Sequence, residues 1–366
     1  MNILHVSTPT TWRGGEQQAA YLAIALKMSG INQLVLCPAE SVLSAKMKEA
    51  HIPVSTYSSR GLLNLKLARR ITTLCGENKF DIIHCHDSHA HSAAVLSAAV
   101  FNNKVPMIVS RRVDFPVSGN FLSRWKYNHP AVKKILCVSE MIRTITAPAI
   151  KDPSKLMVIY SGIDLSRYNT PATDRKLITE LHLSPSVRLV GNISALADHK
   201  DYPTFLNTAA DLCKEYNDIH FIIAGKGPEE EKIRAMIREL KLHEKVHMLG
   251  FRQDVVSVMQ SLDVFLMTSA TEGLGTIILD AFAAGIPVVA TRAGGIPEMV
   301  EDGVTGLLAE PGDVTALKNA VLRVLNESAS AQRLITNARL RVQDFSYEST
   351  AERTLKVYSA VIDPTK

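Results

Sequence analysis

The sequence predicts an α/β protein built from two doubly wound domains. Short apolar runs rich in Val, Ile and Leu alternate with longer helical patterns, which is typical of parallel sheets covered by helices on both faces. This alternation occurs twice in succession, once in each half of the chain. The length of 366 residues is too large for one ordinary core and suits two domains.

The apolar runs predict the strands in chain order. In the first half they lie at residues 2–7, 33–37, 54–57, 81–86, 107–110, 134–139 and 156–160. Helical patterns between them include residues 15–30 and 88–101. In the second half the runs lie at residues 188–194, 220–225, 246–250, 263–269, 287–292 and 305–310.

The domain boundary is expected after residue 165. Gly162 permits a sharp turn behind the last strand of the first half, and Pro171 with its polar neighbours is typical of a linker. The first domain is therefore predicted over 1–165 and the second over 166–344. A capped amphipathic helix at about 345–366, with Ser346 as its N-cap, adds no strand and is expected to pack back on the first domain.

Composition limits the class of protein. The N-terminus has no basic region or cleavage site typical of a signal peptide, and no apolar run approaches the roughly 20 residues of a spanning helix. The five cysteines are scattered, which indicates buried thiols in a reducing compartment. We therefore expect a soluble, cytoplasmic protein that sits at most on the inner face of a membrane.

Charge is distributed unevenly between the two domains. Residues 1–165 contain 19 Lys and Arg against 10 Asp and Glu, whereas the remainder contains 22 against 26. A basic domain favours an anionic partner, although an ordinary solvated surface explains the same counts. Nucleic acid is not expected as the partner, because the basic residues are spread out without an aromatic-interleaved stacking pattern.

Ligands of open α/β sheets bind at the carboxyl ends of strands, and with two domains the expected place is a cleft between them. Gly14 and Gly15 follow the first strand and precede a helix with Glu16 in its first turn. Such glycines allow close backbone approach to an anion, but a plain tight turn is an equal interpretation. The spacing is not GxGxxG, which argues against a nucleotide-dependent oxidoreductase.

Two further glycine-rich turns follow strands in the second half. Gly225 and Gly227 flank Lys226 before the helix-initiating Pro228. The turn after residue 269 contains Glu272 and the stretch from Gly273 through Leu274 and Gly275 to Thr276, where a helix is expected to begin. Its free N–H groups and positive dipole end suit a diphosphate. Asp280, one turn later, can accept hydrogen bonds from a ribose diol.

In this context the sequence resembles the retaining glycosyltransferases of family 4, which have the GT-B fold of two Rossmann-like domains facing across a cleft. The resemblance extends over nearly the whole chain. It includes the segments GGE, HCHDSHA, VIYSGID, GNISALADHKDYPTFLNTA, AGKGP, LGFRQDV, EGLGTIILDAFAAGIPVVAT and GGIPE.

The resemblance implies roles for individual residues. Glu272 would contact hydroxyls of the donor sugar, and the backbone from Gly273 to Thr276 would hold the diphosphate. Lys200 would neutralise that diphosphate, and Asp280 would bind the ribose. The backbone around Gly250, Phe251 and Arg252 would flank the base.

Three positions depart from the family pattern. Asp280 stands where the family has glutamate, so its side chain is one methylene shorter. Asn192, which we count among the donor-binding residues together with Gly14, Gly15, Gly225 and Gly227, stands where an arginine is frequent, so one diphosphate contact is lost or supplied elsewhere. Arg112 stands at the place of an active-site histidine, where a cation favours an anionic substituent on the acceptor or donor; alternatively it only pairs with Asp114.

The segment HCHDSHAH contains four histidines, at 84, 86, 89 and 91. Strand alternation directs His84 and His86 to one side, and Asp87 or Ser88 is expected to cap the next helix. Metal ligation needs three or four converging groups, which strand and helix geometry would spread apart. A sugar or acceptor contact by His86 or His89, and plain packing, are the other interpretations.

The resemblance implies a hexosyltransferase that needs no metal or cofactor and uses a nucleotide-sugar as co-substrate. UDP-sugars and GDP-mannose are both used in the family, and a UDP-sugar is favoured here. We expect a glycan or lipid-linked acceptor of cell-envelope type and peripheral contact with an anionic membrane. A non-catalytic nucleotide-sugar-binding protein of the same fold is the alternative. The basic residues for the anionic contact are Arg69, Arg70, Arg111, Arg112, Arg124, Lys126, Lys133 and Lys134, together with Trp125.

Overall fold

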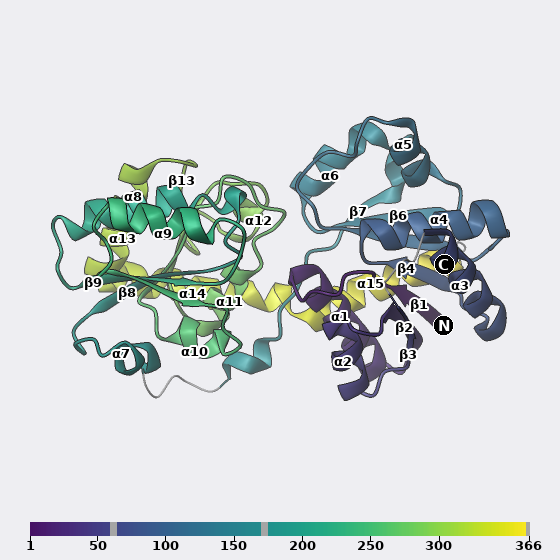
Figure 1. Cartoon of the computed structure of the whole chain (residues 1–366), viewed down its shortest axis with the longest axis horizontal. Helices are drawn as coiled ribbons and strands as arrows, with labels where there is room; N and C mark the ends of the chain where they lie inside the picture. Colours follow the sequence, from purple (N-terminus) through teal and green to yellow (C-terminus); the bar gives the residue numbers. More distant parts are fainter. Residues whose placement is uncertain (59–63, 170–174, 364–366) are drawn as a thin grey trace. The chain divides into compact units, whose positions relative to one another are not determined.

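The computed structural model describes residues 1–58, 64–169 and 175–363. The chain forms two compact units (Figure 1), of which unit 1 contains residues 1–162 and 346–366 and unit 2 contains residues 163–345. The division thus falls at Gly162 and at Ser346, where the sequence suggested 165 and 345. The predicted linker around Pro171 lies in part outside the described residues.

Unit 1 is built on a seven-stranded parallel sheet with the order β3-β2-β1-β4-β5-β6-β7 (Figure 1). The order starts from β1 in the interior of the sheet and winds to both sides, which is the doubly wound arrangement that the sequence predicts. The strands are β1 (Asn2–Val6), β2 (Asn32–Pro38), β3 (Val54–Tyr57), β4 (Ile82–Cys85), β5 (Met107–Arg111), β6 (Val132–Cys137) and β7 (Leu156–Val158).

Helices follow the strands of unit 1 and cover the sheet. Their apolar residues pack with the central strands into a core that includes Ile3, Leu26, Ile82, Ile108 and Tyr358. The α-helices are α1 (Gly14–Met28), α2 (Val42–Glu49), α3 (Asn64–Asn78), α4 (Ser88–Phe101), α5 (Phe121–Asn128), α6 (Glu140–Thr146) and α15 (Tyr347–Ile362), with 3-10 turns η1 (Ala147–Ala149) and η2 (Pro153–Lys155).

Unit 2 repeats the architecture with a six-stranded parallel sheet of order β10-β9-β8-β11-β12-β13. Phe205, Phe221 and Leu266 are fully buried in its core. The strands are β8 (Arg188–Ile193), β9 (Ile219–Ala224), β10 (Val246–Gly250), β11 (Val264–Met267), β12 (Val288–Thr291) and β13 (Leu307–Ala309).

The helices of unit 2 include several short ones at the carboxyl ends of strands. The α-helices are α7 (Lys176–Glu180), α8 (Tyr202–Cys213), α9 (Glu230–Glu239), α10 (Val255–Gln260), α11 (Ile277–Ala284), α12 (Ile296–Met299), α13 (Val314–Asn326) and α14 (Ser328–Arg341). The 3-10 turns are η3 (Leu165–Tyr168), η4 (Asp198–Lys200) and η5 (Val342–Phe345).

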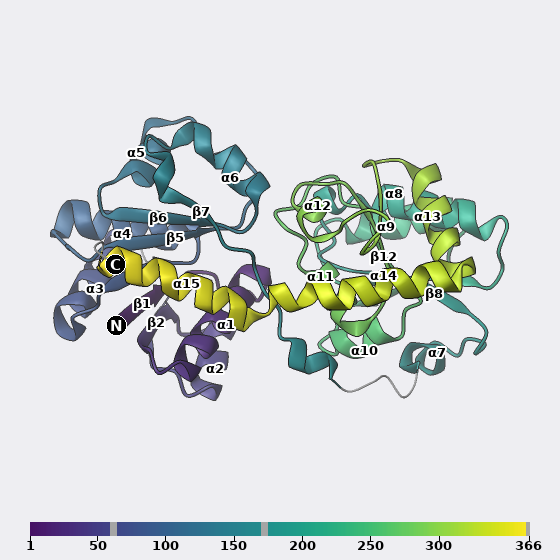
Figure 2. The same cartoon turned by 180° about the vertical axis from the view of Figure 1, so that it is seen from behind.

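The C-terminal helix α15 belongs to unit 1 and lies beside α1 (Figure 2). Its Ser346 side chain accepts a hydrogen bond from the Ser349 amide at 3.0 Å, so the predicted N-cap is confirmed. Gly162 is required at the start of the connection, because a Cβ atom there would lie 2.4 Å from the Ser346 carbonyl oxygen. Gln18 of α1 bonds both the amide and the carbonyl of Gly162. Gly162 therefore connects α1, through Gln18, with the start of α15 at Ser346.

Tyr358 joins α15 to the sheet through a buried hydrogen bond. Its hydroxyl lies 2.5 Å from His84 Nδ1, and the tyrosine is fully buried. We expect Tyr358→Phe to lower the free energy of unfolding by about 2 kcal/mol, because a buried ring nitrogen loses its partner. Urea unfolding would show this as a lower midpoint with an unchanged slope. An unchanged midpoint would mean that the bond adds nothing to the attachment of α15.

None of the helices in the described part of the chain has the length and apolar character needed to span a bilayer. Cys37, Cys75, Cys85 and Cys137 are buried free thiols, and Cys213 is partly buried. The thiols thus belong to the packed interior.

Candidate functional site

Three loops meet at the carboxyl edge of the unit 2 sheet. Lys200 ends η4 in the segment after β8, Glu272 lies in the loop after β11, and Gly294 lies in the turn after β12. These strands are neighbours in a parallel sheet, so their carboxyl ends share one edge. The edge is where an α/β sheet binds ligands.

Lys200 and Glu272 form a buried ion pair. The Lys200 ammonium contacts Glu272 Oε1, and the side chains are 12% and 8% exposed. The Ser269 hydroxyl donates a second hydrogen bond to the same oxygen at 2.7 Å. A pair withdrawn from water in this way holds a positive and a negative group in a fixed position. The structure thus brings together the two side chains that the sequence predicted for the chemistry.

The backbone on both sides of the pair is fixed. The Thr268 hydroxyl donates to the carbonyls of Lys200 and Asp201, at 3.3 and 3.1 Å. The Ala270 amide donates to the His199 carbonyl at 2.9 Å. Asp201 adopts a left-handed conformation and caps α8 through its side chain. Lys200 is therefore positioned by the end of β11 as well as by its own turn.

Gly294 supports Glu272 from the other side. Its φ is +54°, and a Cβ atom would lie 1.9 Å from the Glu272 carbonyl oxygen. The next residue, Gly295, donates its amide to that carbonyl at 3.0 Å. Only glycine fits this close approach, so the GGIPE segment acts as a support for the Glu272 loop.

The predicted helix start after Glu272 is confirmed at Ile277, with Thr276 as its N-cap residue. Gly275 turns the chain into the helix with φ +82°, and Thr276 provides no side-chain cap. Leu274 is buried beneath this turn. The positive end of the α11 dipole therefore lies on the loop of Glu272, where it favours an anion.

Asp280 lies one turn into α11 and is held by Tyr168, whose hydroxyl donates to its Oδ1 at 2.6 Å. Burial raises the pKa of Asp280 to about 6, against the opposing effect of the Tyr168 hydrogen bond. Its carboxylate is ionised for the most part at pH 7. Tyr168 comes from η3 and was not predicted from the sequence, because a single tyrosine just before the expected linker carries no motif.

Asn192 joins two neighbouring strands of unit 2. It is 2% exposed, and its amide donates to the Leu266 carbonyl at 2.9 Å, which joins β8 to β11. Its oxygen accepts from Ser194 at 2.8 Å. The side chain therefore stabilises the strand ends, and its predicted donor contact stays a prediction.

Gly225 and Gly227 allow the turn after β9 to pack against the segment after β8. A Cβ atom at Gly225 would lie 1.8 Å from the Ser194 carbonyl oxygen, and one at Gly227 would lie 2.2 Å from that of Leu196. Gly225 also donates its amide to the Gly250 carbonyl at 2.8 Å. These contacts explain both glycines through packing, so their predicted donor contact stays a prediction.

Beyond β10, Phe251 and Arg252 differ in their environment. Phe251 is 58% exposed, so its ring is accessible to a planar ligand. Arg252 is held by Asp254 at 2.7 Å and by both carboxylate oxygens of Glu180, and these hydrogen bonds raise its pKa. Arg252 therefore fixes the loop after β10, and the ring of Phe251 is the accessible group.

In unit 1, α1 begins at Gly14, earlier than the predicted 15. Among the described residues, none lies within 4 Å of a Cβ atom placed at Gly14 or Gly15, so the backbone there is open to a ligand. Glu16 accepts from the Arg13 amide at 2.7 Å and closes the first turn. Burial raises the pKa of Glu16.

His84 and His86 lie together and are joined by His5 from the neighbouring strand β1. His5 Nδ1 and His86 Nε2 are 2.9 Å apart, and the rings of His84 and His86 are 4.3 Å apart. Burial lowers the pKa of all three, to about 4 for His5, so they are neutral at pH 7. Asp87 caps α4, as predicted. The cluster fills the interior between β1, β4 and α15.

This convergence cannot be read from the segment HCHDSHAH, because His5 comes from another strand. Of the other two histidines in the segment, His89 is exposed, and His91 is buried against Tyr127, away from the cluster. One nitrogen each of His5, His84 and His86 lie within 4.8 Å of one another, which a metal ion could use. Both nitrogens of His84 already have partners, Tyr358 and Ser110. A dication bound through His84 would have to displace one of these partners, whereas His5 Nε2 and His86 Nδ1 have no hydrogen-bond partner among the described residues.

His86 is 6% exposed, and its ring packs against the rings of His5 and His84. Its predicted contact with a substrate stays a prediction, and the accessible ring of the segment is that of His89.

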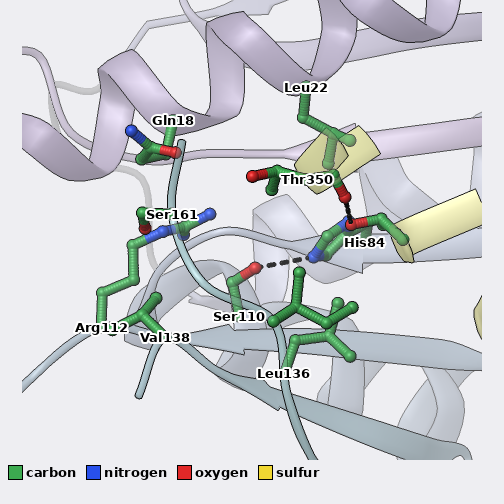
Figure 3. A pocket seen from close by; sticks show the side chains of 11 residues that line it. Gln18, Leu22, His84, Ser110, Arg112, Leu136, Val138, Ser161 and Thr350 are labelled. Atoms are coloured by element: carbon green, nitrogen blue, oxygen red, sulfur yellow. Dashed lines mark hydrogen bonds between the residues drawn. The ribbon is translucent and has the colours of Figure 1, made fainter. Parts of the chain in front are cut away.

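Arg112 donates to the His86 carbonyl at 3.0 Å. Burial lowers the pKa of Arg112 to about 10, and the charges of Glu16 and Asp87 act in the opposite direction. Glu16 and Asp87 thus act on Arg112 as acidic groups, and the pairing with Asp114 stays an alternative interpretation. Arg112 and His84 border a cavity of about 20 Å³ in unit 1 (Figure 3). The cavity has room for a water molecule but not for a sugar.

Family descriptions match each of the two units. Residues 12–167 match Glycosyltransferase Family 4, and residues 175–341 match Glycosyl transferases group 1. N-acetyl-alpha-D-glucosaminyl L-malate synthase from Bacillus anthracis is 25% identical over 83% of this chain and 81% of its own length. D-inositol 3-phosphate glycosyltransferase from Corynebacterium urealyticum is 26% identical over 77% of this chain and 72% of its own length.

Solved structures agree on the fold. Anabaena HepE, in complex with UDP and glucose, matches with a TM-score of 0.86 and 23% identity over 98% of this chain and 100% of that one. At this identity the likeness shows the architecture alone. It confirms the predicted pair of parallel-sheet, Rossmann-like domains of the GT-B type.

Proposed function

Because this chain belongs to the group 1 glycosyltransferases of family 4, we propose that it transfers a hexose from a UDP-sugar to an anionic acceptor, with retention at the anomeric carbon. The acceptor is a glycan or lipid-linked molecule, and the reaction needs neither a metal nor a cofactor. The enzyme works in the cytoplasm, at the inner face of a membrane.

The buried Lys200–Glu272 pair beside the start of α11 carries this proposal. A nucleoside diphosphate leaves the sugar with developing negative charge on its β-phosphate. The Lys200 ammonium and the α11 dipole are positive groups already fixed in place, which stabilise such charge without reorganisation. They supply the charge that a divalent ion supplies elsewhere. Glu272 then aligns the sugar through its hydroxyls.

The transfer step balances without a protein nucleophile. The bond between the anomeric carbon and the phosphate oxygen breaks, and the acceptor hydroxyl oxygen bonds the same face of that carbon. The acceptor proton goes to the departing phosphate. The chain's own residues bind, align and neutralise, and Phe251 offers an exposed ring against which the base can lie.

The charge around Arg112 supports an anionic acceptor. Arg112 follows β5 at the carboxyl edge of unit 1, and its half-buried guanidinium interacts with Glu16 and Asp87. Two relatives described above are named for anionic molecules, L-malate and D-inositol 3-phosphate. An acceptor carboxylate or phosphate would complete the surroundings of this arginine.

We expect UDP to raise the melting temperature of the protein, with or without EDTA. A ligand at about 100 times its Kd stabilises by about 2.7 kcal/mol. Incubation with UDP-glucose or UDP-N-acetylglucosamine and an anionic acceptor should then release UDP and form a glycoside, detected by mass spectrometry.

Different outcomes separate the alternatives. A UDP shift without any product would favour a non-catalytic nucleotide-sugar-binding protein. A shift with GDP alone would correct the donor, and a shift abolished by EDTA would contradict metal independence and direct attention to the His5, His84 and His86 cluster.

UDP binding should depend on the ionisation of Asp280. If its carboxylate accepts the ribose hydroxyls, affinity falls as the pH drops through about 6, where Asp280 gains its proton. Tyr168→Phe removes the hydrogen bond that favours the charged form, so the midpoint should move to higher pH. Isothermal titration between about pH 5 and pH 8, a range that lies on both sides of the pKa of Asp280, would measure this.

Asp280→Asn is the control, because UDP itself gains a proton near pH 6. The part of the pH dependence that disappears in Asp280→Asn belongs to the protein. Identical pH profiles for the two proteins would refute the ribose role of Asp280.

A further inference from the structure

Exposed apolar side chains gather on α5 and the loop before it. Phe121 is 78% exposed, Leu122 71% and Phe115 61%, and Val113 and Trp125 are also exposed. We call these five residues the α5 patch. In unit 1 the helix packs against α4, and α6 lies near it (Figure 1). A cluster of exposed aromatic and aliphatic side chains on one segment indicates an interaction surface.

The helix is anchored on its opposite side. Phe121, Leu122 and Trp125 form a stripe about 100° wide, and Tyr127 lies opposite to it. Tyr127 is buried, stacks edge-on against His91 and accepts a hydrogen bond from Arg111 at 2.9 Å. The apolar stripe is therefore presented outward by a helix whose inner face is firmly packed.

Basic residues surround the patch. Between Arg111 and Lys155 the chain has nine Lys and Arg against three Asp and Glu. Arg124, Lys133 and Lys151 are exposed. Asn128, at the end of α5, accepts from the Lys151 amide at 2.7 Å, so this lysine lies beside the helix. Apolar groups flanked by cations are typical of a surface that rests on anionic lipid headgroups.

We infer that the α5 patch docks unit 1 on an anionic lipid bilayer, with Phe121 and Leu122 entering the interface and the flanking cations contacting headgroups. The inference rests on the proposed function, because a lipid-linked acceptor lies in a membrane. A second copy of the chain fits less well. A symmetric dimer would place this basic surface against itself.

Vesicle co-sedimentation of the full chain tests the inference. We expect affinity for vesicles of phosphatidylcholine with phosphatidylglycerol to exceed that for phosphatidylcholine alone by about tenfold or more, and to fall as salt rises. Phe121→Ser with Leu122→Ser should lower binding to both kinds of vesicle. Arg124→Ser with Lys151→Ser should lower only the binding to anionic vesicles.

Leu340→Ser is the matched control, because Leu340 is 70% exposed on α14 of unit 2. It should leave binding unchanged. Circular dichroism and the UDP-induced melting shift verify that each variant is folded.

Absence of wild-type binding would overturn the inference, as would equal binding by the Phe121→Ser, Leu122→Ser variant. Light scattering that shows a dimer lost in that variant would also overturn it, in favour of a second copy. Vesicle binding without UDP binding would instead contradict the proposed function and leave the docking surface intact.

Discussion

Lys200→Met is expected to reduce the transfer rate by about 10²–10³-fold, the usual effect of removing one preorganised group that stabilises developing charge. The same change leaves Glu272 buried without its cation. A broken buried pair of this kind costs on the order of 3–5 kcal/mol, and the Ser269 hydrogen bond offsets part of it. The rate of UDP release with saturating donor and acceptor, together with urea unfolding, measures both effects.

A second substitution separates the two effects. The double variant Lys200→Met, Glu272→Gln has no unpaired carboxylate at position 272. Its stability should therefore return in large part, while its transfer rate stays low. Lys232→Met is the matched control, since Lys232 pairs with Glu229 at 77% exposure and such surface pairs contribute little. If Lys200→Met transfers sugar at close to the wild-type rate, the leaving charge is stabilised elsewhere and our assignment is wrong.

Gly294→Ala should destabilise the protein by about 3 kcal/mol or more and weaken UDP binding. Part of this cost is the left-handed backbone, which alanine adopts at about 1 kcal/mol. The larger part is the Cβ atom, which would lie 1.9 Å from the Glu272 carbonyl oxygen and must push the Glu272 loop aside. Urea midpoints and UDP titration report the two consequences.

Gly303→Ala isolates the backbone cost. Gly303 has φ +73°, and a Cβ atom there would meet no atom within 4 Å in the described part of the chain. We expect about 1 kcal/mol of destabilisation and unchanged UDP affinity. Equal losses for the two variants would show that Gly294 does not support Glu272.

The fold was predictable because its strands are continuous apolar runs. Buried parallel strands such as β4 and β11 are continuous apolar runs, which can be recognised without knowing the strands that they pair with. The Ser346 cap and the start of α11 were predictable for the same reason, since a cap or a glycine turn is local. The boundaries moved by a few residues because contacts across the sequence, such as Gln18 with Gly162, define the units.

The site was predictable where a motif is contiguous and not where the sheet assembles it. Glu272 and Asp280 belong to one run of residues, and the resemblance added Lys200. The histidine cluster needed the pairing of β1 with β4, which places His5 opposite His84. Asn192 was interpreted as a donor contact because its position was compared with an arginine. Its bonds to the Leu266 carbonyl and to Ser194 depend on the pairing of the strands, which the sequence does not show.

The attachment of α15 has a consequence for the order in which the protein matures. Unit 2 is inserted between residue 162 and residue 346 of unit 1. During synthesis the ribosome therefore releases all of unit 2 before α15 emerges. Until then His84 lacks Tyr358, and the core around Ile3 and Ile108 lacks its last helix. The unit that is translated second can fold completely first.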